Sequence, residues 1–263
     1  MFGIENELYD QLIRLKEDCG LRAIKAEFEA EGSSYGDVAR LRRISAKAGV
    51  ALILKIGGVE ALRDIKDSLE LGVDGLVAPM VESRFGLKKF MDAYRSVYKD
   101  HRIHLAINIE TRSSIAELEG IMGLATGFID GVILGRTDLS ASYLDPSIGP
   151  DCGFIAGLQR EVGARARAYG LSFTVGGSIS GKTVDAFRTD PSLVADVECV
   201  ETRKTILTKE GMLGRSEALD EALRFEELYI LSKKEMSDVM LEAELARIAQ
   251  LNARASHGVS VGA

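Results

Sequence analysis

Short runs of aliphatic and β-branched residues alternate with longer amphipathic stretches along most of this chain. The seven apolar runs occupy residues 23–30, 51–58, 75–82, 104–111, 131–138, 171–178 and 195–202. Several stretches between them end in glycine, which favours the left-handed conformation that closes a helix. Strands that alternate with helices form parallel sheets. The pattern therefore predicts an α/β fold, with one strand fewer than the eight that close a barrel.

A long helical segment follows the last apolar run. Residues 215–254 contain neither proline nor glycine. As one rod they would span roughly 55 to 60 Å at about 1.5 Å per residue, which is more than a single barrel covers. We therefore expect the segment to bend near Ser232 or to reach a neighbouring subunit. We predict a homo-oligomer that assembles through these C-terminal helices.

The composition excludes several classes of protein. With 46% hydrophobic and 28% charged residues among 263, the chain can bury one large core, and we expect a single domain over residues 1–263. The net charge of -7 argues against binding to nucleic acid, since phosphates need clustered cations. No apolar run approaches the roughly 20 residues of a membrane span. Three scattered cysteines without a C-x-x-C pair are typical of reduced thiols, so we expect a cytoplasmic protein with small-molecule partners and no membrane contact.

The first apolar run carries charges at every second position. Lys25, Glu27, Glu29 and Glu31 alternate with apolar residues, and a period of two places all four on one face of a strand. If the apolar face packs against helices, these charges point into a barrel, where Lys55 from the next run could pair with them. The alternative is an edge strand with a solvated charged face, as antiparallel sheets often have. The pattern leaves both open.

Acidic residues stand where three other runs turn polar. Glu110 and Asp138 each end a run, Asn108 and Arg136 share the faces of those two acids, and Glu82 ends a third run. Carboxylates at the carboxyl ends of parallel strands can bind a hard divalent cation such as Mg²⁺, with the neighbouring polar side chains as candidates for substrate binding. Alternatively, each carboxylate caps a helix or forms a salt bridge. Spacing alone does not decide.

A Gly-rich segment matches the phosphate-loop pattern G-x-x-x-x-G-K-[ST] over residues 176–183. A nucleotide-binding domain of that type forms most of its sheet after this loop, whereas only one apolar run follows here. A nucleotide binder therefore remains an alternative function. In a barrel, Gly176 and Gly177 could instead bind a phosphate or carboxylate through backbone N–H groups.

Four segments in order, LILKIGGVEALRDI, GVDGLVAPMVES, INIETRSSIAEL and GVILGRTDLSAS, resemble the HpcH/HpaI aldolase and citrate lyase beta-subunit family of the phosphoenolpyruvate/pyruvate barrel superfamily. The resemblance covers about residues 23–205 and implies a TIM-type (β/α)8 barrel over about residues 20–210. It also implies that Glu110 and Asp138 bind Mg²⁺, Mn²⁺ or another divalent metal. A pyruvate-like 2-oxo acid would bind that metal, and an aldehyde or acyl acceptor would be the second substrate.

The chain departs from the family pattern at its first run. The family's D-x-E-H-G-type segment corresponds here to residues 29–32, Glu-Ala-Glu-Gly, so the catalytic His is absent. We therefore expect Glu29 or Glu31 to act as the acid/base. The family's first strand also has no clear counterpart before residue 23, so closure of the barrel is open.

The second departure concerns positive charge. The Arg that polarises the oxo group in the family is replaced by Lys55, which keeps the charge but loses the bidentate fork. Arg203 could supply the missing guanidinium as a further catalytic residue. Alternatively, Arg203 forms a salt bridge with Glu201 or Glu198.

The sequence thus favours a metal-dependent carbon-carbon lyase or aldolase that acts through a metal-stabilised enolate. A citrate lyase beta-like acyl-coenzyme A lyase is the nearest alternative. A non-catalytic metal-binding barrel and the nucleotide binder are the alternatives from other classes.

Overall fold

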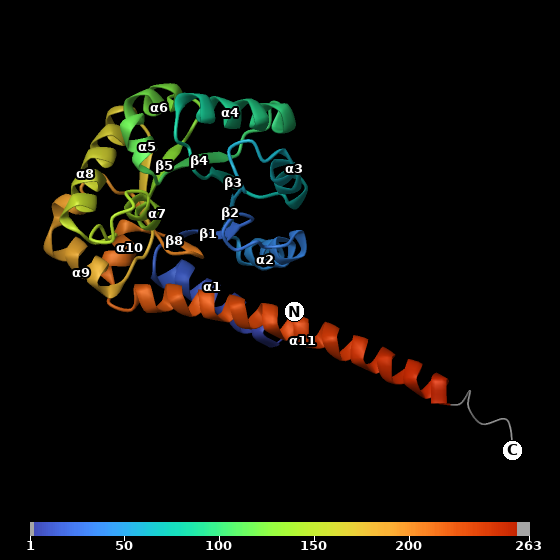
Figure 1. Ribbon diagram of the computed structural model, residues 1–263. Helices are drawn as coiled ribbons and strands as arrows, with labels where there is room; N and C mark the ends of the chain where they lie inside the picture. Colours follow the sequence, from blue (N-terminus) through green and yellow to red (C-terminus); the bar gives the residue numbers. More distant parts are fainter. Residues whose placement is uncertain (1–2, 257–263) are drawn as a thin grey trace, which may run out of the picture.

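Eight strands close into one barrel in chain order, as Figure 1 shows. The structure is a computed structural model and describes residues 3–256. The strands are β1 Leu21–Glu27, β2 Ala51–Lys55, β3 Gly75–Ala78, β4 His104–Ile109, β5 Gly131–Gly135, β6 Ser172–Gly176, β7 Cys199–Glu201 and β8 Thr205–Thr208. The predicted α/β barrel is confirmed, together with its extended C-terminal helical tail.

The barrel closes through an antiparallel strand. Strands β1 to β7 pair in parallel, whereas β8 runs antiparallel to both β7 and β1. A tight turn replaces the expected crossover helix, since Thr202 N donates to Thr205 O at 2.9 Å. The first strand is therefore regular, and the strand that seven apolar runs leave out is the last. A strand of four residues next to β7 gives no separate apolar run in the sequence.

Most strands end before the predicted runs do. β1 ends at Glu27 and β3 at Ala78, so Glu29, Glu31 and Glu82 lie in the loops that follow. The alternation of charges in the first run therefore belongs to a strand only as far as Glu27. Beyond that residue, the direction of each side chain depends on the loop.

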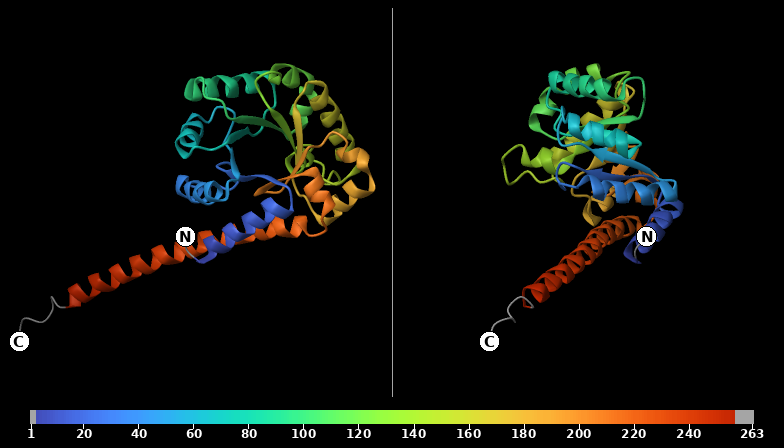
Figure 2. Two further views of the ribbon diagram at one scale, coloured as in Figure 1. Left: turned by 180° about the vertical axis from the view of Figure 1, so that it is seen from behind. Right: turned by 90° about the vertical axis from the view of Figure 1, so that its right-hand side faces the viewer.

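Helices surround the barrel, and their apolar faces pack on the outward side chains of the strands in one large core (Figures 1 and 2). They are α1 Gly3–Asp18, α2 Tyr35–Ala48, α3 Leu62–Leu71, α4 Arg84–Tyr98, α5 Arg112–Ala116, α6 Leu118–Ala125, α7 Arg136–Ala141, α8 Gly153–Ala168, α9 Gly181–Thr189, the 3-10 helix η1 Pro191–Val194, α10 Lys209–Gly214 and α11 Ala218–Ser256. In residues 3–256, no helix combines the length and hydrophobicity that crossing a membrane requires.

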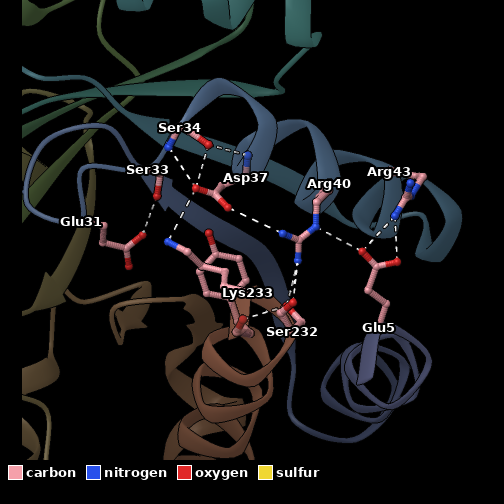
Figure 3. Close-up of polar contacts among 10 residues, drawn as sticks. Glu5, Glu31, Ser33, Ser34, Asp37, Arg40, Arg43, Ser232 and Lys233 are labelled. Atoms are coloured by element: carbon pink, nitrogen blue, oxygen red, sulfur yellow. Dashed lines mark hydrogen bonds and ion pairs between the residues drawn. The ribbon is translucent and has the colours of Figure 1, made fainter. Parts of the chain in front are cut away.

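The first half of α11 packs alongside α1, and the second half extends beyond the barrel (Figures 1 and 2). Arg40 donates to the Ser232 carbonyl at 3.1 Å, and Lys233 approaches Asp37 at 3.7 Å, which ties α11 to α2 (Figure 3). The helix continues through Ser232, where a bend was one of two expectations. All side chains of residues 237–254 are exposed. The expected contact with another subunit stays a prediction.

The interior of the barrel has an apolar layer beneath a charged one. The apolar layer consists of Ala23, Ile53, Val77, Ala106 and Ile133. Two positions further along β1, β2 and β4, the buried residues that follow on the same face are Lys25, Lys55 and Asn108. The polar layer therefore lies at the carboxyl ends of the parallel strands, where barrel enzymes carry their active sites.

Candidate active site

A cavity of about 390 Å³ opens at the carboxyl ends of the strands. It brings together six of the residues expected to form the site: Lys55, Asn108, Glu110, Asp138, Gly177 and Arg203. Lys25, Glu27 and Glu201 line it too, and Leu223 and Glu226 of α11 form part of its wall. Charged residues from the strands and one face of the last helix therefore enclose a single pocket.

Glu110 is fixed by two hydrogen bonds and is only 2% exposed. Its Oε1 accepts from the backbone N–H of Met80 at 2.8 Å, and its Oε2 accepts from Asn108 Nδ2 at 2.8 Å. Burial raises the pKa of Glu110, while the nearby Lys55 opposes that rise. The carboxylate is thus held in one orientation at the pocket wall.

Lys55 lies between two carboxylates. Its Nζ is 2.8 Å from Glu29 Oε2 and 3.7 Å from Glu110 Oε2. Burial disfavours the charged form, but Glu110 and Glu29 outweigh it and raise the pKa of Lys55. A lysine that forms a Schiff base needs a neutral amine, so this environment favours an electrostatic role instead.

A second buried ion-pair cluster is centred on Lys25 of β1, the strand next to β2. Lys25 Nζ is 2.7 Å from Glu201 Oε1 and 3.3 Å from Glu27 Oε1, and all three side chains are at most 7% exposed. Burial opposes the charge of Lys25, but the two carboxylates outweigh it and raise its pKa. From the sequence, Glu201 was expected only as a possible salt-bridge partner of Arg203. Its position at the end of an apolar run, like that of Glu110, was the signal that could have identified it.

Two glycines make room for the two carboxylates. A Cβ on Gly135 would lie 2.6 Å from Glu110 Oε2, and a Cβ on Gly176 would lie 2.6 Å from Glu201 Cγ. Gly135 ends β5, which lies next to β4, and Glu110 follows β4. Gly176 ends β6, which lies next to β7, and Glu201 is the last residue of β7. Gly176, expected to contact substrate, thus provides the surface on which Glu201 packs.

Gly177 does line the pocket, and its φ of 83° lies in the left-handed region that favours glycine. A Cβ there would approach the backbone nitrogens of Arg136 and Thr137 at 2.7 and 2.6 Å. The loop after β6 therefore packs directly on the start of α7.

Arg136 and Glu82 do not line this pocket. Arg136 is the first residue of α7, and its buried guanidinium donates to the carbonyls of Gly176 and Gly177 and to Asp151 Oδ1 at 3.3, 2.9 and 3.0 Å. Arg136 thereby holds the start of the loop after β6 from outside the pocket. Glu82 lies four residues beyond the end of β3 and is exposed. Arg136 and Asp138 do not share a strand face as expected, because β5 ends at Gly135 and both residues lie on α7.

The expected acid/base residues are engaged in ion pairs beside the pocket. Glu29 pairs with Lys55, and Glu31 forms an ion pair with the buried Lys204 and accepts from Ser33 Oγ at 3.2 Å. Neither carboxylate lines the cavity. Both follow the end of β1, and the loop directs them to cations at its sides.

Arg203 stands at the rim of the pocket with its side chain 52% exposed. Its Nε is 3.9 Å from Glu226 Oε1 on α11, so its acidic neighbour differs from both partners considered in the sequence. Burial raises the pKa of Glu226, and Arg203 opposes that rise. The guanidinium is thus placed to meet a ligand at the entrance.

The phosphate-loop match serves as a helix cap. Ser180 Oγ accepts from Thr183 N at 3.4 Å at the start of α9, and Thr183 Oγ1 donates to Asp151 at 2.9 Å. Lys182 is exposed. Gly176 and Gly177 pack on Glu201 and on α7, so packing accounts for these two glycines and helix capping for Ser180 and Thr183.

The donor set at the pocket fits a cation that takes part of its coordination from substrate. Glu110, directly after β4, and Asp138, in the first turn of α7, both line the pocket, and Asn108 Oδ1 has no hydrogen-bond partner within residues 3–256. In the same part of the chain, no three His, Cys, Asp or Glu side chains form a metal-binding group. Mg²⁺ commonly binds one or two carboxylates and completes its shell with water and substrate oxygens, which this arrangement allows.

Known structures share this fold. An HpcH/HpaI aldolase/citrate lyase family protein from Burkholderia cenocepacia J2315 is 16% identical, with 84% of this chain and 89% of that one covered and a TM-score of 0.60. An HpcH/HpaI aldolase from Desulfitobacterium hafniense DCB-2 is 15% identical over 74% and 82% of the two chains, with a TM-score of 0.58. The citrate synthase SbnG is 16% identical over 88% and 91%, with a TM-score of 0.57. At such identities the likeness shows the fold alone.

The sequence itself gives the closer assignment. No curated protein matches the chain significantly. Residues 37–171, more than half of the chain, match the family described as HpcH/HpaI aldolase/citrate lyase. That match includes β2 to β5 and both Glu110 and Asp138. The chain therefore belongs to the HpcH/HpaI aldolase/citrate lyase family.

Proposed function

We propose that this protein is a divalent-metal-dependent carbon-carbon lyase or aldolase that acts on a pyruvate-like 2-oxo acid. Membership of the family supports lyase chemistry. The observation that carries the proposal is the placement of Glu110, Asp138 and Lys55 around one pocket at the carboxyl ends of the strands. This arrangement concentrates charge where an enolate would need it.

Glu110 and Asp138 would hold the cation. When bound, Mg²⁺ or Mn²⁺ supplies positive charge close to the oxygens of the 2-oxo acid and acts as a Lewis acid. Glu110 has the fixed orientation that this role needs, because Met80 and Asn108 hold both of its oxygens. Asp138 is exposed and can adjust to a ligand.

Lys55 and Arg203 would supply the remaining positive charge. Lys55 keeps its proton beside Glu29 and Glu110, so it can attract an oxyanion without a bidentate hydrogen bond. Arg203 at the rim can donate to a carboxylate with its planar fork. We assign to Lys55 the charge on the reacting oxygen and to Arg203 the recognition of the incoming ligand.

The second substrate would be an aldehyde, with an acyl-coenzyme A thioester as the alternative. One of the similar structures is a citrate synthase, so we also consider carbon-carbon bond formation with a second substrate other than an aldehyde. The pocket wall from α11 offers Leu223 and Glu226 to that substrate. Cleavage of a 4-hydroxy-2-oxo acid against that of a 3-hydroxyacyl thioester distinguishes the two.

We also propose that the protein assembles into a homo-oligomer through α11. The distal half of the helix exposes Leu241, Leu245, Ile248 and Leu251, which are 48 to 56% accessible. Apolar side chains at such spacing on one helix favour burial against another chain. Sedimentation of the full chain beside a variant with Leu241, Leu245 and Ile248 changed to Ser tests this, and equal mass for both would refute it.

Calorimetric titration with Mg²⁺ and Mn²⁺ tests the metal site. We expect binding by the wild type and an affinity lower by about 100-fold or more in Glu110→Ala and Asp138→Ala, since each removes a ligand. Glu161→Ala changes an exposed carboxylate of the outer helix α8 and serves as control. Absence of binding in the wild type, or equal binding in all four proteins, would refute the proposal. Metal binding without turnover of any 2-oxo acid would mark a non-catalytic barrel.

A further inference from the structure

The proposed chemistry needs a group that accepts and returns a proton, and the family's His is absent. Glu29 and Glu31 were the candidates in the sequence. Both lie outside the cavity, paired with Lys55 and with Lys204. The acid/base must therefore be sought among the carboxylates that line the pocket.

Glu201 has the required combination of position and freedom. It lines the pocket at the end of β7 and is 5% exposed. Its Oε1 accepts from Lys25 Nζ at 2.7 Å, while its Oε2 has no hydrogen-bond partner in the described chain. A buried carboxylate oxygen without a donor is costly, so its retention points to a partner that arrives with the ligand.

The other carboxylates that line the pocket differ from Glu201 in their hydrogen bonds, proposed role or exposure. Both oxygens of Glu110 accept hydrogen bonds, and Asp138 completes the proposed metal pair. Glu226 is only partly buried and faces Arg203 at the rim. Glu27 shares Lys25 with Glu201 at the longer distance of 3.3 Å. Glu201 is thus the pocket carboxylate that accepts from a cation at one oxygen and has no hydrogen-bond donor in the described chain at the other, buried oxygen.

Gly176 adds an independent sign that the position of Glu201 is specified. A Cβ at residue 176 would lie 2.6 Å from Glu201 Cγ and 2.9 Å from Oε1. Any other residue would displace the carboxylate into the pocket or away from Lys25. Gly176 therefore leaves space for the Glu201 side chain in the same way as Gly135 leaves space for the Glu110 side chain.

We propose that Glu201 is the general acid/base of the reaction and that Lys25 is its positioning residue. The role rests on the proposed function. In the forward direction, the C–H bond at the methyl carbon of the pyruvate unit breaks and its proton passes to Glu201 Oε2. The electron pair of that bond becomes the carbon-carbon double bond of the enolate, and the negative charge moves to the carbonyl oxygen.

The same proton closes the cycle. The enolate carbon attacks the carbonyl carbon of the acceptor and forms the new carbon-carbon bond, which leaves an alkoxide. Glu201, now a carboxylic acid, donates its proton to that alkoxide and returns to the carboxylate. Cleavage is the reverse: Glu201 removes the hydroxyl proton, the carbon-carbon bond breaks, and the acid protonates the enolate carbon. Lys25 holds Oε1 throughout, so Oε2 is the oxygen that exchanges the proton.

Exchange of the pyruvate methyl protons with D₂O, followed by proton NMR in the presence of Mn²⁺-free Mg²⁺, tests this role without a second substrate. In Glu201→Gln we expect the exchange rate to fall by about 10² to 10⁴-fold, as for loss of a general base. Its Mg²⁺ affinity by calorimetry should stay within about threefold of wild type, since Glu201 is not a proposed ligand. Glu198→Gln makes the same change at an exposed site just before β7 and should exchange like wild type.

A second variant covers the case in which Glu201→Gln does not fold. Glu201→Asp keeps the charge beside Lys25 but withdraws the carboxylate by one methylene. We expect it to melt near wild type and to exchange at least about tenfold more slowly.

The outcomes separate this role from the function on which it rests. Exchange by wild type together with near-equal exchange by the two Glu201 variants would overturn the role and leave the lyase intact. Loss of both exchange and Mg²⁺ affinity in Glu201→Gln would also overturn it, because Glu201 would then support the metal. Failure of wild type to exchange pyruvate protons would overturn the proposed function and this role with it.

Discussion

The two layers of the barrel interior are made by the same strands and differ in almost every property. The lower layer of Ala23, Ile53, Val77, Ala106 and Ile133 is apolar and borders a cavity at the amino end of the barrel. Two residues further along β1, β2 and β4, the interior carries Lys25, Lys55 and Asn108. One step of the strand repeat thus separates a hydrophobic core from a reactive pocket.

The comparison shows what allows charge inside a barrel. Lys25 and Lys55 are buried, at 6 and 7% exposed, and each has carboxylates within 3.7 Å. Buried charge is stable only when it is paired. The five residues of the lower layer carry no charge, and the upper layer can be polar because the ends of the strands supply opposite charges to Lys25 and Lys55.

The largest expected effect comes from placing a charge in the wrong layer. Ile133→Asp would bury a carboxylate in the apolar layer, two residues before Gly135 of the same strand. We expect destabilisation of more than about 4 kcal/mol, because the carboxylate would lose its hydration among the apolar side chains of this layer. Urea denaturation followed by circular dichroism measures it.

Ile133→Val is the matched control and should cost about 0.5 to 1.5 kcal/mol, as for loss of one buried methylene. If the Asp variant were as stable as the Val variant, the proposed division between the layers would be wrong.

A smaller effect is expected from a substitution beside Glu110, one of the two proposed metal ligands. In Gly135→Ala, the new Cβ would lie 2.6 Å from Glu110 Oε2 and 2.9 Å from Glu110 Cβ, so Glu110 must shift. We expect Mg²⁺ affinity to fall by about 10 to 100-fold, with a stability loss of about 1 to 3 kcal/mol from overpacking. Calorimetric titration and thermal unfolding report the two quantities.

Gly157→Ala is its control, since nothing lies within 4 Å of a Cβ at that position in α8. It should leave metal affinity unchanged and stabilise the helix by about 0.5 to 1 kcal/mol. Unaltered metal binding in Gly135→Ala would show that the space which Gly135 leaves for Glu110 is not needed for metal affinity.

The smallest effect concerns the amino end of the barrel. Cys199 lines a second cavity of about 380 Å³ there, and burial raises the pKa of its thiol to about 11, with Arg22 opposing the rise. Only thiolate reacts with iodoacetamide, and at pH 8 about one thiol in 10³ would be ionised. Labelling should therefore accelerate about tenfold per pH unit from pH 8 to 10.

Mass spectrometry of the peptide that contains Cys199 gives the rate, and the urea-unfolded chain is the reference. An unfolded thiol, with a pKa near about 8.5, should already approach its maximal rate by about pH 9. Because the folded state keeps its proton where the unfolded state loses it, the free energy of unfolding should fall as pH rises from about 9 to 11. Equal pH profiles in both states would contradict the burial of this thiol.

Much of the fold could be predicted because its signals are local. Alternation of strands and helices, glycines at helix ends and the absence of a linker all lie within short stretches of sequence. The position of Glu110 directly after β4 belongs to the same class of signal, whereas Asp138 lies on α7, beyond the end of β5. β8 could not be found in this way, since Thr205–Thr208 is short and pairs with β1 from the far end of the chain.

The candidate site was predicted in part. Lys55, Asn108 and Glu110 were expected in the pocket, where they lie, because their strands extend close to them. Glu29, Glu31, Glu82 and Arg136 fall beyond strand ends, where a loop or a new helix sets the direction of the side chain. A period of two holds only while the backbone stays extended.

By itself, the sequence determined which residues form strands and helices and which acids stand at the strand ends, because hydrophobic periodicity and capping act over a few residues. The tertiary structure alone decided that Lys25 joins Glu27 to Glu201, that Gly135 and Gly176 underlie two carboxylates, and that α11 walls the pocket. Those contacts join residues up to 176 positions apart. Only closure of the barrel brings such residues within reach of one another, and no local pattern encodes which of them will meet.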